Sequence, residues 1–149
     1  MGKGRRKLFW GVLLVLNLAL IWGNSLVSGA ESGQMSGGIM EFVMKLLQIP
    51  AVYSDTVHLL IRKLAHITEF ACLSALISWC LGRVKEKRVH QILLAVLISM
   101  AVALMDETIQ LYTPERGPSL VDVWIDTLGA VLGMTAVQLG YHLKKKNKT

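Results

Sequence analysis

Four long apolar segments constrain this chain more than any other feature of its sequence. They cover approximately residues 8–26, 57–81, 89–105 and 119–143. A helix needs about 20 apolar residues to cross the ~30 Å hydrocarbon core of a bilayer. In lipid, only helices or a closed barrel satisfy every backbone hydrogen bond, and runs of this length without strict alternation are helices. The sequence therefore predicts a single domain, residues 1–149, with the fold of an all-α membrane protein with four transmembrane helices.

The composition of the chain excludes two other classes of protein. Of its 149 residues, 53% are hydrophobic and only 17% are charged. Soluble proteins contain about 25% charged residues, and disordered chains and nucleic-acid-binding domains both need many exposed charges. The formal net charge of +6 is instead gathered in short clusters outside the apolar segments. We therefore expect an integral membrane protein with no nucleic-acid partner.

Lysine and arginine residues indicate how the predicted helices are oriented. They cluster before the first segment, between the second and third, and after the fourth: Lys3, Arg5, Arg6 and Lys7; Arg83, Lys85, Lys87 and Arg88; Lys144, Lys145, Lys146 and Lys148. The other two connections contain only Lys45 and Arg116. Because cytoplasmic loops carry the excess of positive charge, we expect a multi-pass protein of the cell membrane with both termini in the cytoplasm.

The first segment also has features of a secretory signal. Basic residues precede its apolar run, and the small residues Ser28, Gly29 and Ala30 follow it as a possible cleavage site. The apolar run is long for a signal peptide, whose apolar region spans about 7–15 residues. We therefore expect the segment to remain as the first transmembrane helix.

A short amphipathic helix is predicted in the first extracytoplasmic connection. Residues 28–38 are rich in glycine and serine, which is typical of a flexible turn. Ser36 is then a suitable N-cap for a helix over residues 37–48 that ends before Pro50. Its apolar residues recur at helical spacing, so we expect it to lie on the outer surface of the bilayer.

Ionisable residues in the second span are the first functional signal. A charge at the bilayer centre costs at least ~2.5–3.5 kcal/mol, so such residues usually face the interior of a bundle. Arg62, His66 and Glu69 stand at positions i, i+4 and i+7, which places them on one helical face. Lys63 lies one position off this face. The second span therefore presents one polar face to its neighbours.

The third and fourth spans present matching polar faces. Asp106 with Gln110, and Asp122 with Asp126, are pairs at i, i+4 spacing. At a rise of ~1.5 Å per residue, Asp106 and Asp126 lie ~26 Å from the cytoplasmic boundary, and His66 lies ~24 Å from it. We therefore predict that the three spans share a polar pocket in the outer part of the membrane.

The connection over residues 106–118 completes the predicted site. Pro114 and Pro118 favour a short turn between antiparallel third and fourth spans. Such a turn would hold Arg116 over the opening of the pocket. Glu107 lies one position off the polar face of the third span.

Three blocks of the sequence resemble the signature blocks of a known family. They are residues 61–70 (IRKLAHITEF), 106–110 (DETIQ) and 116–129 (RGPSLVDVWIDTLG). In this order and spacing they are similar to the VanZ-like membrane proteins, and the likeness extends over about residues 20–140. That family is named for a member linked to low-level teicoplanin resistance. The resemblance therefore implies a role at the cell envelope and in glycopeptide tolerance, and it places the site in these blocks.

An enzyme is one functional class that the predicted pocket suits. His66 with Glu69, or Asp106 with Asp126, would act as general acid and base on a lipid-linked or cell-wall substrate. The same four residues and Asp122 also offer nitrogen and oxygen ligands to a divalent metal. No metal motif such as H-E-x-x-H is present, so we predict no metal site, and the sequence indicates no particular cofactor.

A binding protein is the second class, and a transporter is the third. Arg62, Lys63 and Arg116 would grip the anionic headgroup of a membrane lipid or envelope precursor. The other predicted substrate-binding residues are Glu107, Gln110 and Asp122. A small transporter or proton relay fits less well because the charges lie on one side of the membrane, and a purely structural scaffold is the remaining alternative.

Several of these residues also have a structural explanation. Arg62 and Lys63 could extend to the membrane boundary, and His66 and Glu69 could share a hydrogen bond. The sequence SLVD that ends at Asp122 fits a capping box at the start of the fourth span. The glycines that indicate close packing between helices are Gly129, Gly133 and Gly140.

Overall fold

A computed structural model describes residues 3–81 and 88–146, and these residues form helices without any strand. The helices are α1 (Lys3–Leu26), α2 (Gly29–Leu47), α3 (Ser54–Leu81), α4 (Arg88–Gln110) and α5 (Leu120–Lys146), with a 3₁₀ turn η1 (Ala51–Tyr53) before α3. Within the described parts of the chain, α1, α3, α4 and α5 are long and apolar enough to cross a membrane. The predicted all-α fold with four spans is confirmed.

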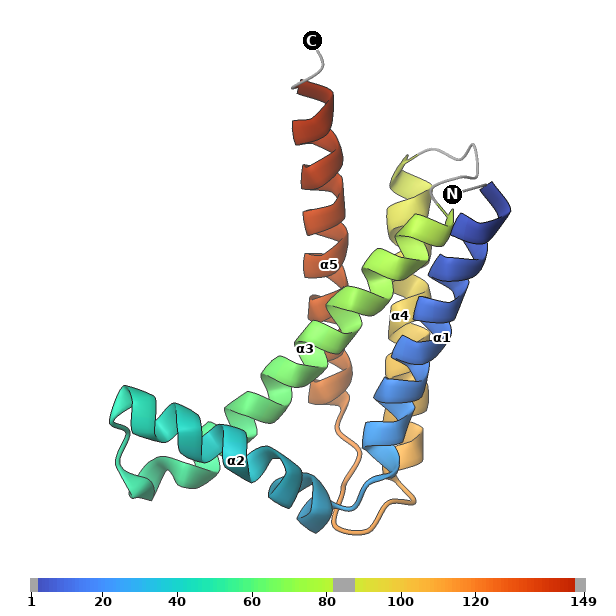
Figure 1. Cartoon of the computed structure of the whole chain (residues 1–149). Helices are drawn as coiled ribbons and strands as arrows, with labels where there is room; N and C mark the ends of the chain where they lie inside the picture. The colour runs from blue at the N-terminus through green and yellow to red at the C-terminus, as the bar shows by residue number, and fades with distance from the viewer. Residues whose placement is uncertain (1–2, 82–87, 147–149) are drawn as a thin grey trace.

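The four long helices form a bundle that α2 crosses at one end (Figure 1). α1 begins and α5 ends at the opposite end, the top of the figure. α3 runs obliquely and packs against α1, α2, α4 and α5. The side of the membrane that each end faces stays a prediction. Residues 82–87, which contain Arg83, Lys85 and Lys87 of the second basic cluster, lie outside the described residues.

α4 extends further than the sequence predicts. It ends at Gln110 instead of near residue 105, so Asp106 lies on its final turns and not in a connecting turn. Helix-breaking residues appear only beyond this point, at Pro114, Gly117 and Pro118. The polar end of α4 is therefore part of a regular helix that can hold side chains in fixed directions.

α2 begins earlier than predicted, and the expected glycine-rich turn over residues 28–38 is wrong. Ser28 is the N-cap, and its Oγ accepts a hydrogen bond from the backbone N–H of Glu31 at 3.2 Å. The Glu31 carboxylate accepts the N–H of Ser28 in return, which completes a capping box. This reciprocal cap starts the helix despite the glycines that follow. Its location on the bilayer surface stays a prediction.

Small residues bring α3 and α5 into close contact. A Cβ atom at Gly129 would lie 2.5 Å from the carbonyl oxygen of Ile67, and one at Gly133 would overlap the carbonyl oxygen of Ala71. Ser74 Oγ of α3 donates to the carbonyl oxygen of Ala130 at 2.8 Å. The close packing predicted for Gly140 is wrong, because no described residue lies within 4 Å of a Cβ built there.

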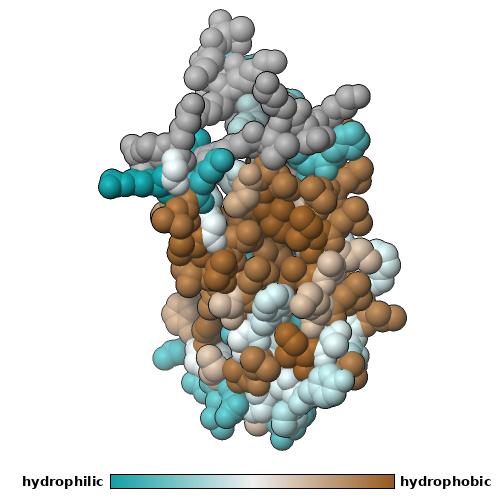
Figure 2. Space-filling model, turned by 90° about the vertical axis from the view of Figure 1, so that its right-hand side faces the viewer, coloured by the Kyte–Doolittle hydropathy of each residue, from teal (hydrophilic) through white to brown (hydrophobic). Residues whose placement is uncertain are grey.

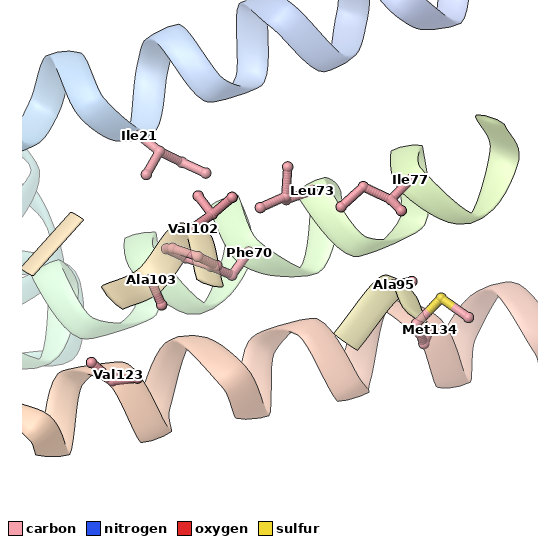
Figure 3. Packing of buried hydrophobic residues seen from close by; sticks show 9 residues of the cluster. All are labelled: Ile21, Phe70, Leu73, Ile77, Ala95, Val102, Ala103, Val123 and Met134. Atoms are coloured by element: carbon pink, nitrogen blue, oxygen red, sulfur yellow. The ribbon is translucent and has the colours of Figure 1, made fainter. Parts of the chain in front are cut away.

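The apolar side chains divide between a small core and a large outer surface. Figure 3 shows the core, in which side chains of α1, α3, α4 and α5 meet around the fully buried Phe70 and Leu73. Many other large apolar side chains are exposed, including Leu8 of α1 and Trp124 of α5. On the face in Figure 2, a hydrophobic band separates more hydrophilic ends. An exposed apolar surface of this size is typical of a membrane-facing protein.

Candidate functional site

Three ionisable side chains from three helices meet near the end of the bundle that α2 crosses. They are His66 of α3, Asp106 of α4 and Asp126 of α5. One nitrogen or oxygen atom of each lies within 4.8 Å of those of the other two. The carboxylates are buried, since 0% of Asp106 and 1% of Asp126 is exposed. This His66–Asp106–Asp126 cluster contains all but one of the residues that the sequence predicts as catalytic.

Hydrogen bonds from two helices hold the Asp106 carboxylate. Ser25 Oγ of α1 donates to Oδ1 at 2.6 Å, and Gln110 Nε2 donates to Oδ2 at 3.0 Å. Gln110 Nε2 also contacts Ser25 Oγ at 3.2 Å. Beyond α4, the hydroxyl of Thr113 donates to the backbone carbonyl oxygen of Ser25 at 2.8 Å. This network joins α4 to the end of α1 and fixes the direction of the Asp106 side chain.

Asp126 lacks such support. Neither of its carboxylate oxygens has a hydrogen-bond partner among the described residues, and the same holds for the buried Nδ1 of His66. Nδ1 of His66 lies 3.8 Å from Oδ1 of Asp126, which is too long for a hydrogen bond. Buried polar atoms are nearly always paired in folded proteins. The space between Nδ1 of His66 and the carboxylate of Asp126 is therefore a position for a proton, an ion or a ligand atom.

Glu69 lies apart from the cluster although it is near His66 in the sequence. Its Oε1 accepts a hydrogen bond from Asn24 Nδ2 of α1 at 2.7 Å. Asn17 Nδ2, also on α1, lies 3.4 Å from the backbone carbonyl oxygen of Glu69. Among the described residues, a hydrogen bond between His66 and Glu69 is absent. Glu69 therefore contributes to the contact between α3 and α1.

Three of the predicted binding residues, Lys63, Asp122 and Glu107, have partners on neighbouring elements. Lys63 of α3 forms an ion pair with Asp122 of α5. The backbone N–H of Ser119 donates to Oε2 of Glu107 at 2.6 Å, so Glu107 holds the start of α5. The capping box predicted for Asp122 is therefore wrong, because its carboxylate pairs with Lys63 and the Ser119 N–H is used by Glu107.

Arg62 and Arg116 are the cations left at the site. Within the described part of the chain, neither forms an ion pair, and the buried Nε of Arg116 has no hydrogen-bond partner there. Burial and then the nearby charge of Arg62 lower the pKa of Arg116 below its ordinary value. A guanidinium remains protonated at neutral pH even so. Two cations close together that form no ion pair in the described chain favour an anionic ligand.

The structure contains two adjoining cavities at this site. The polar cavity has a volume of about 210 Å³ and is lined mainly by ionisable residues: Arg62, Lys63, His66, Glu115, Arg116, Asp122 and Asp126. The apolar cavity has a volume of about 250 Å³ and lies between α2 and α3, with the apolar lining residues Val27, Met35, Ile39, Ile61 and Ala65. Arg62, His66 and Arg116 line both cavities. Gln110 also lines the polar cavity, and Glu69 lines the apolar one.

Sequence reasoning missed the contributions of α1 and α2. Asn24 and Ser25 of α1 bond to Glu69 and Asp106, as described above. Asn17, Asn24 and Ser25 stand at i, i+7 and i+8 in an otherwise apolar segment. That spacing places the three residues on one face of a helix, and this pattern could have identified α1 as a contributor to the site. A second missed contact joins α2 to α3, where Ser36 Oγ lies 2.6 Å from His58 Nε2.

Comparison with known proteins gives one match. A family model described as VanZ/LLP1 matches residues 9–141. No curated protein and no solved structure matches the chain. The matched region includes the whole His66–Asp106–Asp126 cluster and both arginines of the polar cavity. The likeness carried by the three sequence blocks is confirmed, and the chain belongs to the VanZ/LLP1 family.

Proposed function

We propose that this multi-pass membrane protein binds an anionic amphiphile, a lipid or an envelope precursor, with its headgroup in the polar cavity and its chain in the apolar cavity. The observation that carries the proposal is that Arg62, His66 and Arg116 line both cavities at once. An amphiphile has a charged part joined to an apolar part. A site for one needs cationic groups at the boundary between a polar and an apolar space.

The polar cavity suits a phosphate or carboxylate headgroup. Guanidinium groups bind such anions with paired, charge-assisted hydrogen bonds. Arg116 has a buried Nε without a hydrogen-bond partner in the described chain, and Arg62 lies close enough to affect it. Lys63 contributes less, because Asp122 already neutralises it. Arg62 and Arg116 are therefore the main headgroup ligands in this proposal.

The apolar cavity suits part of an acyl or polyprenyl chain. Met35 and Ile39 of α2 line it from one side, and Ile61 and Ala65 of α3 line it from the other. A helix that crosses the end of the bundle (Figure 1) can cover a chain that enters from the bilayer. Ser36 and His58, which join α2 to α3, would hold this cover in place.

Binding, with or without a chemical step, is favoured over transport. The second half of α3, from Phe70 to Leu81, contains no Asp, Glu, Lys or Arg, and the same is true of residues 127–143 of α5. A relay of charged groups across the membrane would need them along that half as well. If the bound molecule is chemically altered, His66 and Asp126 border the polar cavity and are the groups available for proton transfer.

The predicted orientation gives this binding a cellular consequence. With both termini in the cytoplasm of a cell, the two cavities would lie at the outer face of the cell membrane. An envelope lipid held there would be withdrawn from the surface that a glycopeptide such as teicoplanin meets. Altered glycopeptide tolerance is therefore the phenotype that we expect from loss of the site.

Removing the Arg116 guanidinium tests the proposal directly. We expect Arg116→Gln to weaken binding of phosphatidylglycerol about tenfold or more, since a hydrogen bond to a charged group contributes ~1.5–3 kcal/mol and 1.4 kcal/mol is a factor of ten. Binding is measured by native mass spectrometry of detergent-purified protein titrated with phosphatidylglycerol, and with phosphatidylcholine as the zwitterionic comparison.

Lys45→Gln is the matched control. Lys45 is an exposed cation of α2 that lines neither cavity, so its loss changes net charge equally and should leave lipid binding unchanged. Equal affinities of Arg116→Gln and the unmodified protein for phosphatidylglycerol would contradict the proposed function.

A further inference from the structure

We infer that the His66–Asp106–Asp126 cluster is a binding site for a divalent transition-metal ion. The inference rests on the geometry of three buried or partly buried side chains and does not depend on the proposed lipid binding. The sequence predicts no metal site because it contains no local ligand motif. Because the three ligands come from three separate helices, they do not form a local motif in the sequence.

The separation of the three side chains suits a metal. Their nearest nitrogen and oxygen atoms lie within 4.8 Å of one another. Zinc bonds to imidazole nitrogen and carboxylate oxygen are about 2.0–2.2 Å long, which puts neighbouring ligand atoms of a tetrahedral site roughly 3.3 Å apart. Nδ1 of His66 and Oδ1 of Asp126 are already 3.8 Å apart. Small side-chain rotations are enough to close the site around an ion.

The unpaired atoms in the cluster are an independent sign of a ligand. Asp126 is 1% exposed, and both of its oxygens lack a hydrogen-bond partner within residues 3–81 and 88–146. The buried Nδ1 of His66 is unpaired in the same region and is the nitrogen nearest to Asp126. A carboxylate buried without a partner is strongly unfavourable. A cation between these groups would compensate both of them.

Asp106 is the third ligand, and its neighbours orient it. Ser25 donates to one of its oxygens and Gln110 to the other. Hydrogen bonds of this kind orient carboxylate ligands in metal sites. Each oxygen keeps a second lone pair, so Asp106 can bind a metal without losing either hydrogen bond.

The chemistry of the ligands selects the class of metal. One imidazole nitrogen with two carboxylate oxygens suits zinc or manganese, whereas magnesium and calcium prefer oxygen ligands alone. Two carboxylates also balance the charge of a divalent ion. His66 and Asp126 line the polar cavity, so further coordination positions would open into the space that Arg62 and Arg116 border. Three protein ligands with an open position are typical of catalytic metal sites.

Metal binding to the tag-free, full-length protein tests the inference. Detergent-purified protein is stripped with EDTA, desalted and titrated with Zn²⁺ or Mn²⁺ by calorimetry, and its metal content is measured by mass spectrometry after dialysis. We expect about one ion per chain, with Mg²⁺ and Ca²⁺ bound far more weakly. The ion that binds should also raise the midpoint of thermal unfolding.

Variants of the cluster decide whether the ion sits there. We expect Asp126→Asn and His66→Gln each to lower affinity at least about 100-fold, since even changes to groups around the ligands cost 10–100-fold. Asp55→Asn is the matched control, because Asp55 is an exposed carboxylate in the first turn of α3 that lines neither cavity, and this variant should bind metal normally. Size-exclusion profiles establish that each variant is folded.

Two results would overturn the inference. One is a folded, EDTA-stripped protein that takes up neither Zn²⁺ nor Mn²⁺ in a saturable way. The other is equal metal affinity in the unmodified protein and in folded Asp126→Asn. Arg116→Gln should keep metal binding while losing the anionic lipid, so failure of the lipid proposal is recognisable separately.

Discussion

Replacing Gly133 by alanine is expected to destabilise the protein by about 3 kcal/mol. A methyl group at this position overlaps the backbone carbonyl oxygen of Ala71, and a backbone atom cannot rotate away as a side chain can. α3 and α5 must separate, and overpacking of this kind typically costs 1–3 kcal/mol or more. In a protein of this length the loss corresponds to a fall of roughly 10 °C in the midpoint of thermal unfolding, which size-exclusion profiles of heated, detergent-purified protein would measure.

Gly140→Ala is the control for this change. Gly140 lies on the same helix, and none of the described residues comes within 4 Å of a Cβ built there. Alanine is favoured over glycine in helices by about 1 kcal/mol, so the midpoint should stay the same or rise. A Gly133→Ala protein as stable as Gly140→Ala would show that α3 and α5 do not touch as described.

Hydropathy predicts the four spans well because each of the four helices contains an 18-residue apolar window with at most two charged residues. It fails where polarity changes within a helix. α4 continues through Asp106 and Glu107 to Gln110, although these residues end the apolar run. Their side chains are buried and hydrogen-bonded to other parts of the chain, Asp106 and Gln110 to Ser25 and Glu107 to the N–H of Ser119. These contacts stabilise the continuation of the helix. Such a tertiary effect cannot be read from the segment alone.

The start of α2 shows a second limit of sequence reasoning. Glycine and serine between residues 28 and 38 favour a turn by composition. The Ser28–Glu31 capping box was present in the sequence, but it competes with four glycines in the first ten residues of the helix. Contacts with other elements add to the cap: the N–H of Gly29 donates to the Pro114 carbonyl oxygen at 3.1 Å, and that of Ala30 to Glu115 at 2.9 Å.

The candidate site is predictable in part of its members and not in its pairings, since Asn24 and Ser25 of α1 were missed and Glu69 lies apart from the cluster. Spacing at i, i+4 shows which side chains share a face, and that is enough to select His66, Asp106 and Asp126. It does not give the rotation of one helix against another, which decides that Lys63 meets Asp122 and that Glu69 turns to α1. Residues three apart on a helix differ by about 60° in direction, so His66 and Glu69 face different neighbours.

The two buried aspartates should respond differently to the same substitution. Asp106→Ala is expected to destabilise the protein by about 1–3 kcal/mol in EDTA, because the buried Ser25 hydroxyl loses its acceptor and Gln110 loses one of its two partners, and an unsatisfied buried donor costs ~1–3 kcal/mol. The free energy of unfolding of Asp126→Ala should lie within about 1 kcal/mol of that of the unmodified protein, or above it. This substitution removes a buried carboxylate that has no hydrogen bonds in the described chain. Thermal unfolding of both variants, with EDTA present throughout, gives the comparison.

The two substitutions delete the same atoms from side chains that are both almost fully buried, although Asp126 already borders the polar cavity and Asp106 does not. The difference between the variants mainly measures the hydrogen bonds and the unpaired charge. Equal losses at the two positions would mean that Asp126 has stabilising partners and that the gap beside His66 is filled in the folded protein. A large loss at Asp106 alone would instead show that the folded protein gains nothing in stability from Asp126 without a ligand, as expected of a residue whose partner is a bound ligand.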